Sequence, residues 1–150
     1  MDDTNVRFQR ANFVVSDLER SLTLYRDILG MHVEFTKDSP EDSYSYEVFG
    51  IDNSVPLGFA VLGTASQPRV MALTETRGLN LPEISLPRRA AIVLHVDNID
   101  SVVQACQDAG LHVYREDLLE TNDGRTGREF GILDFDGNLV VIYHIASTAN

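Results

Sequence analysis

Residues 13–33 read FVVSDLERSLTLYRDILGMHV, and residues 94–113 read LHVDNIDSVVQACQDAGLHV. The two stretches align with one single-residue deletion, so that Val15 matches Val96 and Asp27 matches Asp108. Each copy begins with an apolar strand-like segment, continues with apolar residues at helical spacing, and reaches a glycine before a second apolar segment. A repeat of this kind predicts two copies of one strand–helix–strand unit.

Both predicted helices carry start and stop signals. Ser16 and Glu19 have the spacing of a capping box, while Asp97 or Asn98 caps the second helix. Gly30 and Gly110 suit the position after a helix because glycine accepts a positive φ. The positions expected to be buried are Leu18, Leu22, Tyr25, Leu29, Ile99, Val102, Val103 and Cys106.

More β-structure is expected after each unit. The predicted strands are residues 7–15, 31–36, 44–51, 57–62, 69–74, 90–96, 111–114, 129–135 and 139–145. The last two flank Asp136-Gly137-Asn138, a strong hairpin signal. Residues 76–89, which contain two Leu-Pro pairs, are expected to link the halves, and the polar residues 118–127 to form a mobile lid. The chain is thus predicted to be one α+β domain with modules at about 6–75 and 90–146.

Two motifs resemble those of the vicinal-oxygen-chelate superfamily, which includes glyoxalases, extradiol dioxygenases and bleomycin-resistance proteins. One is VSDLERSL at residues 15–22 followed by YRDILG at residues 25–30. The other is LDFDGNLV at residues 133–140, in which Phe135 replaces the usual proline. The resemblance covers nearly the whole chain. It implies two βαβββ modules that form an open cup of mixed β-sheet.

In metal-dependent members of that superfamily, His, Gln or Glu ligands lie on inner strand positions. The resemblance places three of these positions at Arg10, Ala91 and Val141, and the fourth among Met71, Ala72 and Leu73. A guanidinium has no free lone pair, and the other side chains have no hard donor atom. The sequence therefore predicts no metal ion and no cofactor at the usual place. Glu75 follows the fourth position closely, so an atypical metal site near His95 and Glu75 remains an alternative.

The resemblance also indicates which residues line the cup, because strand side chains alternate between faces. Alternation gives Arg10, Asn12, His95, Val141 and Tyr143 as expected ligand-binding residues, and Phe130 is added as an aromatic ring suited to stacking on a ligand. His95 and Tyr143 are the candidate acid or base groups, with Arg10 holding an anionic or carbonyl oxygen. Alternatively, these side chains fill the cup by hydrogen-bonding one another. His144 has the parity of Val140 and is expected beneath the helices.

Composition limits the partners. The 150 residues include 12 Lys and Arg against 23 Asp and Glu, a formal net charge of −11. Nucleic acid binding requires clustered basic residues and is not expected. No apolar run is long enough for a membrane span, and the acidic, polar start favours a cytoplasmic protein. The single cysteine excludes an intramolecular disulfide.

Three functions remain open at this point. The first is metal-free binding of a small organic ligand, as in bleomycin-resistance proteins, with the ligand in the cup or in a dimer groove. The second is a glyoxalase- or dioxygenase-type enzyme with an atypical metal site or with acid–base catalysis by His95. The third is an interaction domain without a ligand. A homodimer is expected in each case, because an open cup exposes apolar strand faces.

Overall fold

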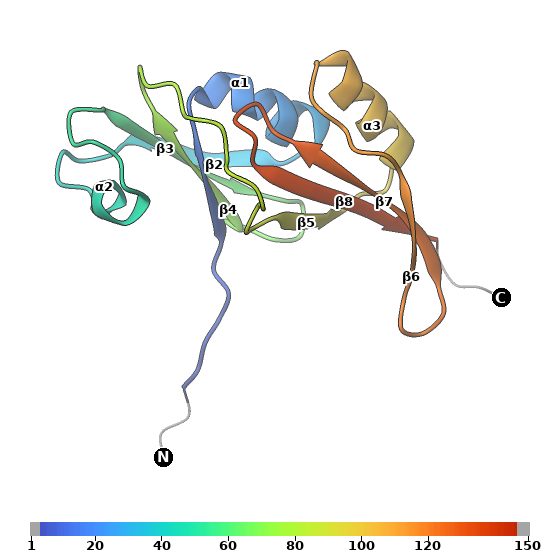
Figure 1. The fold of residues 1–150 in the computed structure, drawn as a ribbon. Helices are drawn as coiled ribbons and strands as arrows, with labels where there is room; N and C mark the ends of the chain where they lie inside the picture. Colours follow the sequence, from blue (N-terminus) through green and yellow to red (C-terminus); the bar gives the residue numbers. More distant parts are fainter. Residues whose placement is uncertain (1–3, 147–150) are drawn as a thin grey trace. The chain divides into compact units, whose positions relative to one another are not determined.

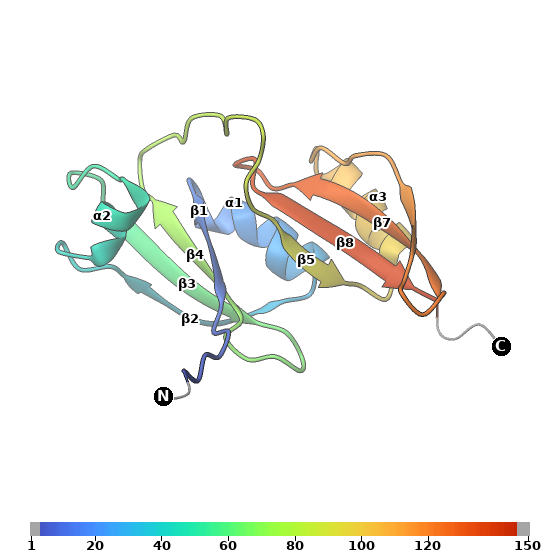
Figure 2. The same cartoon turned by 60° about the horizontal axis from the view of Figure 1, so that its bottom comes forward.

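The structure is a computed structural model that describes residues 4–146. The chain divides into two compact units. The first contains residues up to 18 together with 31–79, and the second contains residues 19–30 together with those from 80 onward. Each unit holds one four-stranded mixed sheet. Figures 1 and 2 show the strands and helices of both units. The predicted α+β fold with two equivalent sheets is confirmed.

The first sheet has the strand order β1-β4-β3-β2. Its strands are β1 (Ala11–Val15), β2 (His32–Asp38), β3 (Leu57–Gly63) and β4 (Met71–Thr76). β1 pairs with β4 in parallel, and the other two pairings are antiparallel. Every residue of the central strands β3 and β4 is buried except Phe59 and Glu75. This near-continuous burial explains why both segments are apolar runs in the sequence.

Residues 44–51, predicted as a strand, instead form the helix α2 (Tyr44–Phe49). The Ser43 side chain accepts a hydrogen bond from the Ser45 N–H and caps the helix start. Gly50 ends the helix with a left-handed φ of 70°. The prediction was wrong because it relied on tyrosine, valine and phenylalanine, which favour strands. The capping residue Ser43 and the terminating residue Gly50 favour a helix instead.

The second sheet repeats the topology of the first, with the order β5-β8-β7-β6. Its strands are β5 (Ile92–His95), β6 (Asp117–Glu120), β7 (Thr126–Leu133) and β8 (Leu139–Ile145). β5 pairs with β8 in parallel, and the remaining pairs are antiparallel. In both sheets the first strand of the module pairs with its last strand, β1 with β4 and β5 with β8. The two modules thus share one topology, as the sequence repeat predicts.

The helices of the second unit lie next to each other on one side of β7 and β8 (Figures 1 and 2). They are the segment that begins at α1 (Leu18–Leu22) and continues as the π-helix η1 (Thr23–Ile28), and α3 (Ile99–Asp108). Gly30 and Gly110 follow them with φ of 77° and 80°, as predicted. Within residues 4–146, no helix has the length and apolar character needed to cross a membrane.

The π-helical turn changes which residues of the first helix are buried. The Leu29 N–H donates to the carbonyl oxygen of Leu24 at 2.8 Å, a five-residue spacing that rotates the following side chains. Leu22 and Tyr25 are buried as predicted, whereas Leu24 is also buried and Leu29 only partly so. The regular 3.6-residue period used for the prediction does not apply across this turn.

Two segments of the second unit differ from their predicted structure. Residues 111–114 form only the single bridge Val113–Ile132, and the strand comes later, as β6. Residues 118–127, predicted as a lid, form most of the β6–β7 hairpin, in which Leu119 pairs with Gly127. Polar composition suggested a loop here, but the backbone of this segment is paired in the ladder.

Candidate functional site

The two faces of the second sheet differ in burial. Val140, Ile142 and Ile132 share one face and are fully buried, and α3 contacts β8. The pairing register places a second set of residues on the other face, which we call the open face. Its members are Val93, His95, Glu129, Gly131, Val141 and Tyr143, all of them exposed or half-buried. A sheet with one packed and one accessible face can receive a ligand on the latter.

The open face brings together three of the residues predicted from the sequence. His95 is the register partner of Tyr143, and the two rings meet edge to face with their centroids 5.1 Å apart. Val141 lies on the same face, beside Val93, whose side chain is 62% exposed. The His95 side chain is 44% exposed and thus accessible for proton transfer.

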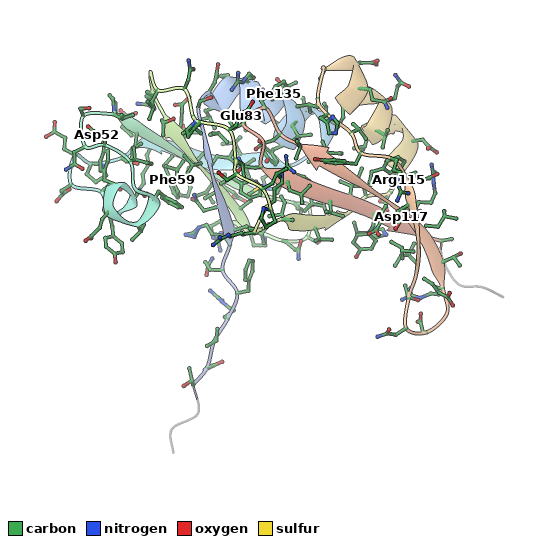
Figure 3. The ribbon with its side chains drawn as sticks, viewed as in Figure 1. Asp52, Phe59, Glu83, Arg115, Asp117 and Phe135 are labelled. Carbon is green, nitrogen blue, oxygen red and sulfur yellow. The ribbon has the colours of Figure 1, made fainter. Side chains whose placement is uncertain are left out.

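Acidic side chains gather at one end of the open face. Glu129 pairs in register with Tyr143 on one side and with Asp117 on the other. Asp117 lies 3.8 Å from the Arg115 guanidinium, and Figure 3 shows both at the start of β6. No such ion pair joins Glu129 to another described residue. This part of the face therefore presents a free carboxylate next to an aromatic ring.

An aromatic side chain that sequence reasoning missed covers the middle of this face. Tyr114 donates its N–H to the Gly131 carbonyl at 2.8 Å. A Cβ atom at Gly131 would lie 3.1 Å from the Tyr114 ring, so any larger residue there would push this ring away by a few tenths of an ångström. His112 meets Tyr114 edge to face at 4.5 Å. The signal in the sequence was the single-glycine break in a strand, which often marks a close approach.

Phe130 does not belong with the other predicted ligand-binding residues. It pairs with Ile142, and so its side chain lies on the helix-covered face of the sheet, opposite Tyr143. Its ring lies 5.8 Å from the guanidinium carbon of Arg128. Phe130 was predicted from its aromatic ring, and residue type alone does not indicate on which face of a strand a side chain lies.

Arg10 and Asn12, also predicted to bind ligand, belong to the first unit. Arg10 is exposed and immediately precedes β1. The amide of Asn12 donates to the Thr74 hydroxyl at 3.1 Å, across the parallel pair β1–β4. This bond agrees with the alternative stated above, in which polar residues of the strands satisfy one another.

The sequence matches the profile of the glyoxalase/bleomycin resistance protein/dioxygenase superfamily over residues 7–142. The chain belongs to this superfamily. It is 30% identical over 102 residues to a lactoylglutathione lyase of Escherichia coli O157:H7, which covers 68% of this chain and 67% of that protein.

Solved structures show the same fold. A glyoxalase family protein of Bacillus cereus superposes with a TM-score of 0.70 at 18% identity, over 97% of each chain. The trypanothione-dependent glyoxalase I of Leishmania major gives 0.66 at 20% identity, over 93% of this chain and 87% of that one.

The positions that correspond to metal ligands in this superfamily do not fit a metal ion in this chain. Arg10 and Ala91 lie just before β1 and β5, and both are exposed. Val141 occupies the corresponding position of β8. Met71, Ala72 and Leu73 of β4 are all buried and apolar. Arginine, alanine, valine and leucine side chains offer no lone pair to a cation, and the only donor atom among these residues is the soft thioether sulfur of Met71.

A groove of about 540 Å³ lies beside the β6–β7 hairpin. Its lining residues are Leu118, Leu119, Glu120, Thr126, Gly127, Arg128, His144 and Ala146. Arg128 bonds Asp100 at 2.9 Å and also bonds Glu116, and these two carboxylates raise the pKa of Arg128. The Arg128 guanidinium is bound to these carboxylates, and the rest of the groove is mostly apolar. The sequence did not predict this groove, because residues 118–127 were expected to form a mobile lid and not a paired hairpin.

Proposed function

We propose that this chain binds a small organic molecule on the open face of its second sheet, without the metal ion of its metal-dependent relatives. The observation that carries the proposal is the contrast between the two faces. The helix-covered face has fully buried apolar residues, whereas the open face leaves Val93 and the His95–Tyr143 pair accessible. Exposed apolar surface with a few polar groups is typical of small-molecule sites.

The same residues indicate the chemistry of the ligand. Glu129 supplies a carboxylate without an ion-pair partner among the described residues, next to the ring of Tyr143. A cation gains from both, through charge attraction and through the face of the aromatic ring. The net charge of −11 adds long-range attraction for a positively charged compound. We therefore expect an aromatic or aliphatic organic cation.

A thermal-shift screen with aromatic and aliphatic amines tests this proposal. We expect at least one amine to raise the Tm, because a ligand that binds only the folded state stabilises it. Val141→Arg places a guanidinium on the open face and is expected to abolish the shift. Val48→Arg makes the same change on α2, where the side chain is 54% exposed, and should leave it intact. The absence of any shift, or an equal loss in both variants, would contradict the proposal.

A glyoxalase-type enzyme is the second candidate, and the identity to a lactoylglutathione lyase favours it. Its acid–base group would be His95, which contacts Tyr143. The assay is turnover of S-lactoylglutathione by the full chain, with His95→Gln as the test variant. Turnover that depends on His95 would replace the binding proposal. The third candidate, an interaction domain without a ligand, is favoured if neither turnover nor an amine-dependent shift is found.

A further inference from the structure

Three side chains with metal-binding atoms meet at the end of β5. They are His95, Asp97 and His144, and one ligand atom from each lies within 4.8 Å of the others. The Nδ1 atom of His95 is 3.9 Å from Oδ1 of Asp97. The two imidazole rings have centroids 5.3 Å apart and are inclined by 36°. Two imidazoles and a carboxylate are a ligand set common in transition-metal sites.

The backbone explains why these residues meet. β5 ends at His95, and Val96 continues the pairing only through its N–H, which donates to the Tyr143 carbonyl at 2.9 Å. Asp97 then follows in a bend before α3. His144, the neighbour of Tyr143 on β8, reaches Val96 past the end of β5. By strand alternation, His95 and His144 are expected on opposite faces of the sheet. That expectation does not hold beyond the end of β5, where the two rings come close together.

A second contact prepares His144 for coordination. Its Nδ1 atom lies 2.8 Å from the Val96 carbonyl oxygen. A carbonyl oxygen only accepts, so Nδ1 carries the hydrogen and donates it. The lone pair of the neutral ring is then on Nε2, the other nitrogen. Metal-binding histidines are usually held by such a bond to a backbone carbonyl, which fixes both tautomer and ring orientation.

We propose that His95, Asp97 and His144 bind one divalent transition-metal ion, with Zn²⁺ as the reference ion. Zinc lies about 2.0–2.2 Å from nitrogen and oxygen ligands, so ligand atoms of a tetrahedral site are about 3.4 Å apart. The present separations of up to 4.8 Å are larger, so ion binding requires the side chains to rotate toward one another. The His95 and Asp97 side chains are 44% and 91% exposed, so both have space for such a rotation.

This site is separate from the metal position of the superfamily and goes beyond the proposed function. It uses none of Arg10, Ala91 and Val141, the residues found at the usual positions. Three protein ligands leave a fourth tetrahedral position for water or for a ligand atom. Imidazole ligands favour zinc, copper, nickel and iron, whereas magnesium prefers oxygen ligands.

The test is calorimetric titration of the chelator-treated full chain with zinc chloride. We expect one ion per chain, and no comparable binding of magnesium chloride. Asp97→Asn and His144→Gln should each weaken zinc binding at least tenfold, because each removes a direct ligand. His32→Gln and His112→Gln are matched controls, since both histidines are exposed and lie outside the cluster, and they should bind zinc normally.

A spectroscopic readout makes the test independent of any activity. Cobalt bound by this ligand set should give visible absorption bands in the unchanged chain and lose them in Asp97→Asn. That variant alters a highly exposed side chain and should fold, so it decides the result if His144→Gln does not. Zinc binding that is unchanged in Asp97→Asn, or lost equally in His32→Gln, would overturn the proposal. The outcome would then be adventitious binding only.

Discussion

The Tyr25 hydroxyl makes a buried polar contact that joins the first helix of the second unit to the β7–β8 turn. It donates to Oδ2 of Asp134 at 2.8 Å. Oδ1 of the same carboxylate accepts the N–H groups of Asp136 and Asn138, and Oδ2 also accepts from the Asn138 amide. Burial nevertheless raises the pKa of Asp134. The turn motif in the sequence is therefore a hydrogen-bonded cap centred on one buried carboxyl group.

Tyr25→Phe should lower the free energy of unfolding by about 1–3 kcal/mol, because it leaves a buried acceptor with one fewer donor. Burial and the nearby Asp134 carboxylate raise the pKa of Tyr25 well above its usual 10.0. The unfolded phenol ionises near pH 10, so this contribution is present below pH 10 and is lost as the pH rises above it.

The measurement is urea unfolding of both proteins between pH 8 and 11. The unchanged chain should lose more stability over this range than Tyr25→Phe. Tyr44→Phe is the control, because Tyr44 is 72% exposed, and it should follow the unchanged chain. Parallel pH profiles for the unchanged chain and Tyr25→Phe would contradict the role assigned to the buried hydroxyl.

At the scale of elements, the repeat in the sequence predicted both sheets, because strand and helix signals recur in the same order. The wrong predictions concerned single elements and not the overall topology. Residues 44–49 are good strand formers that became α2, since Ser43 and Gly50 supply helix ends. The π-helix η1 changed the buried face of the first helix, and its five-residue hydrogen-bond spacing is not predicted by the pattern of apolar residues.

The candidate site could be predicted from the sequence only where its strands are regular. Alternation placed His95, Val141 and Tyr143 on one face, and pairing agrees with it. Phe130 lies on the other face, because its prediction rested on its aromatic ring and not on strand alternation. The meeting of Asp97 with His144 lay beyond prediction, because it occurs where β5 has ended and periodicity no longer locates a side chain.

Val48→Ala distinguishes helix from strand at α2. Alanine has the higher helix propensity, by about 0.5 kcal/mol, and Val48 is 54% exposed, so little packing is lost. We expect the free energy of unfolding to stay the same or rise slightly. The same substitution at Val61, fully buried in β3, should lower it by about 2 kcal/mol. A clear loss for Val48→Ala would favour the strand that the sequence pattern suggested.

At the scale of the whole molecule, exposed apolar side chains favour association of two copies of the chain, whereas the excess negative charge opposes it. Leu118 on the edge strand β6 is 76% exposed, and Phe35 on the edge strand β2 is 45% exposed. Edge strands with exposed apolar residues favour association with another chain. Each chain also carries a net charge of −11, which repels a second copy.

We therefore propose a homodimer whose stability rises with salt. Its apolar contacts are insensitive to ionic strength, whereas charge repulsion between the copies falls as the Debye length shortens from about 30 Å at 0.01 M salt to about 8 Å at 0.15 M. Sedimentation velocity should show a larger dimer fraction, at twice the 16.7 kDa chain mass, in 150 mM than in 10 mM sodium chloride. Leu118→Lys should weaken the dimer if β6 contributes to the interface, and Val48→Lys on α2 is the matched exposed control. A single 16.7 kDa species at both salt concentrations would contradict the dimer. A dimer that weakens with salt would show instead that ion pairs, and not apolar contacts, hold the two copies together.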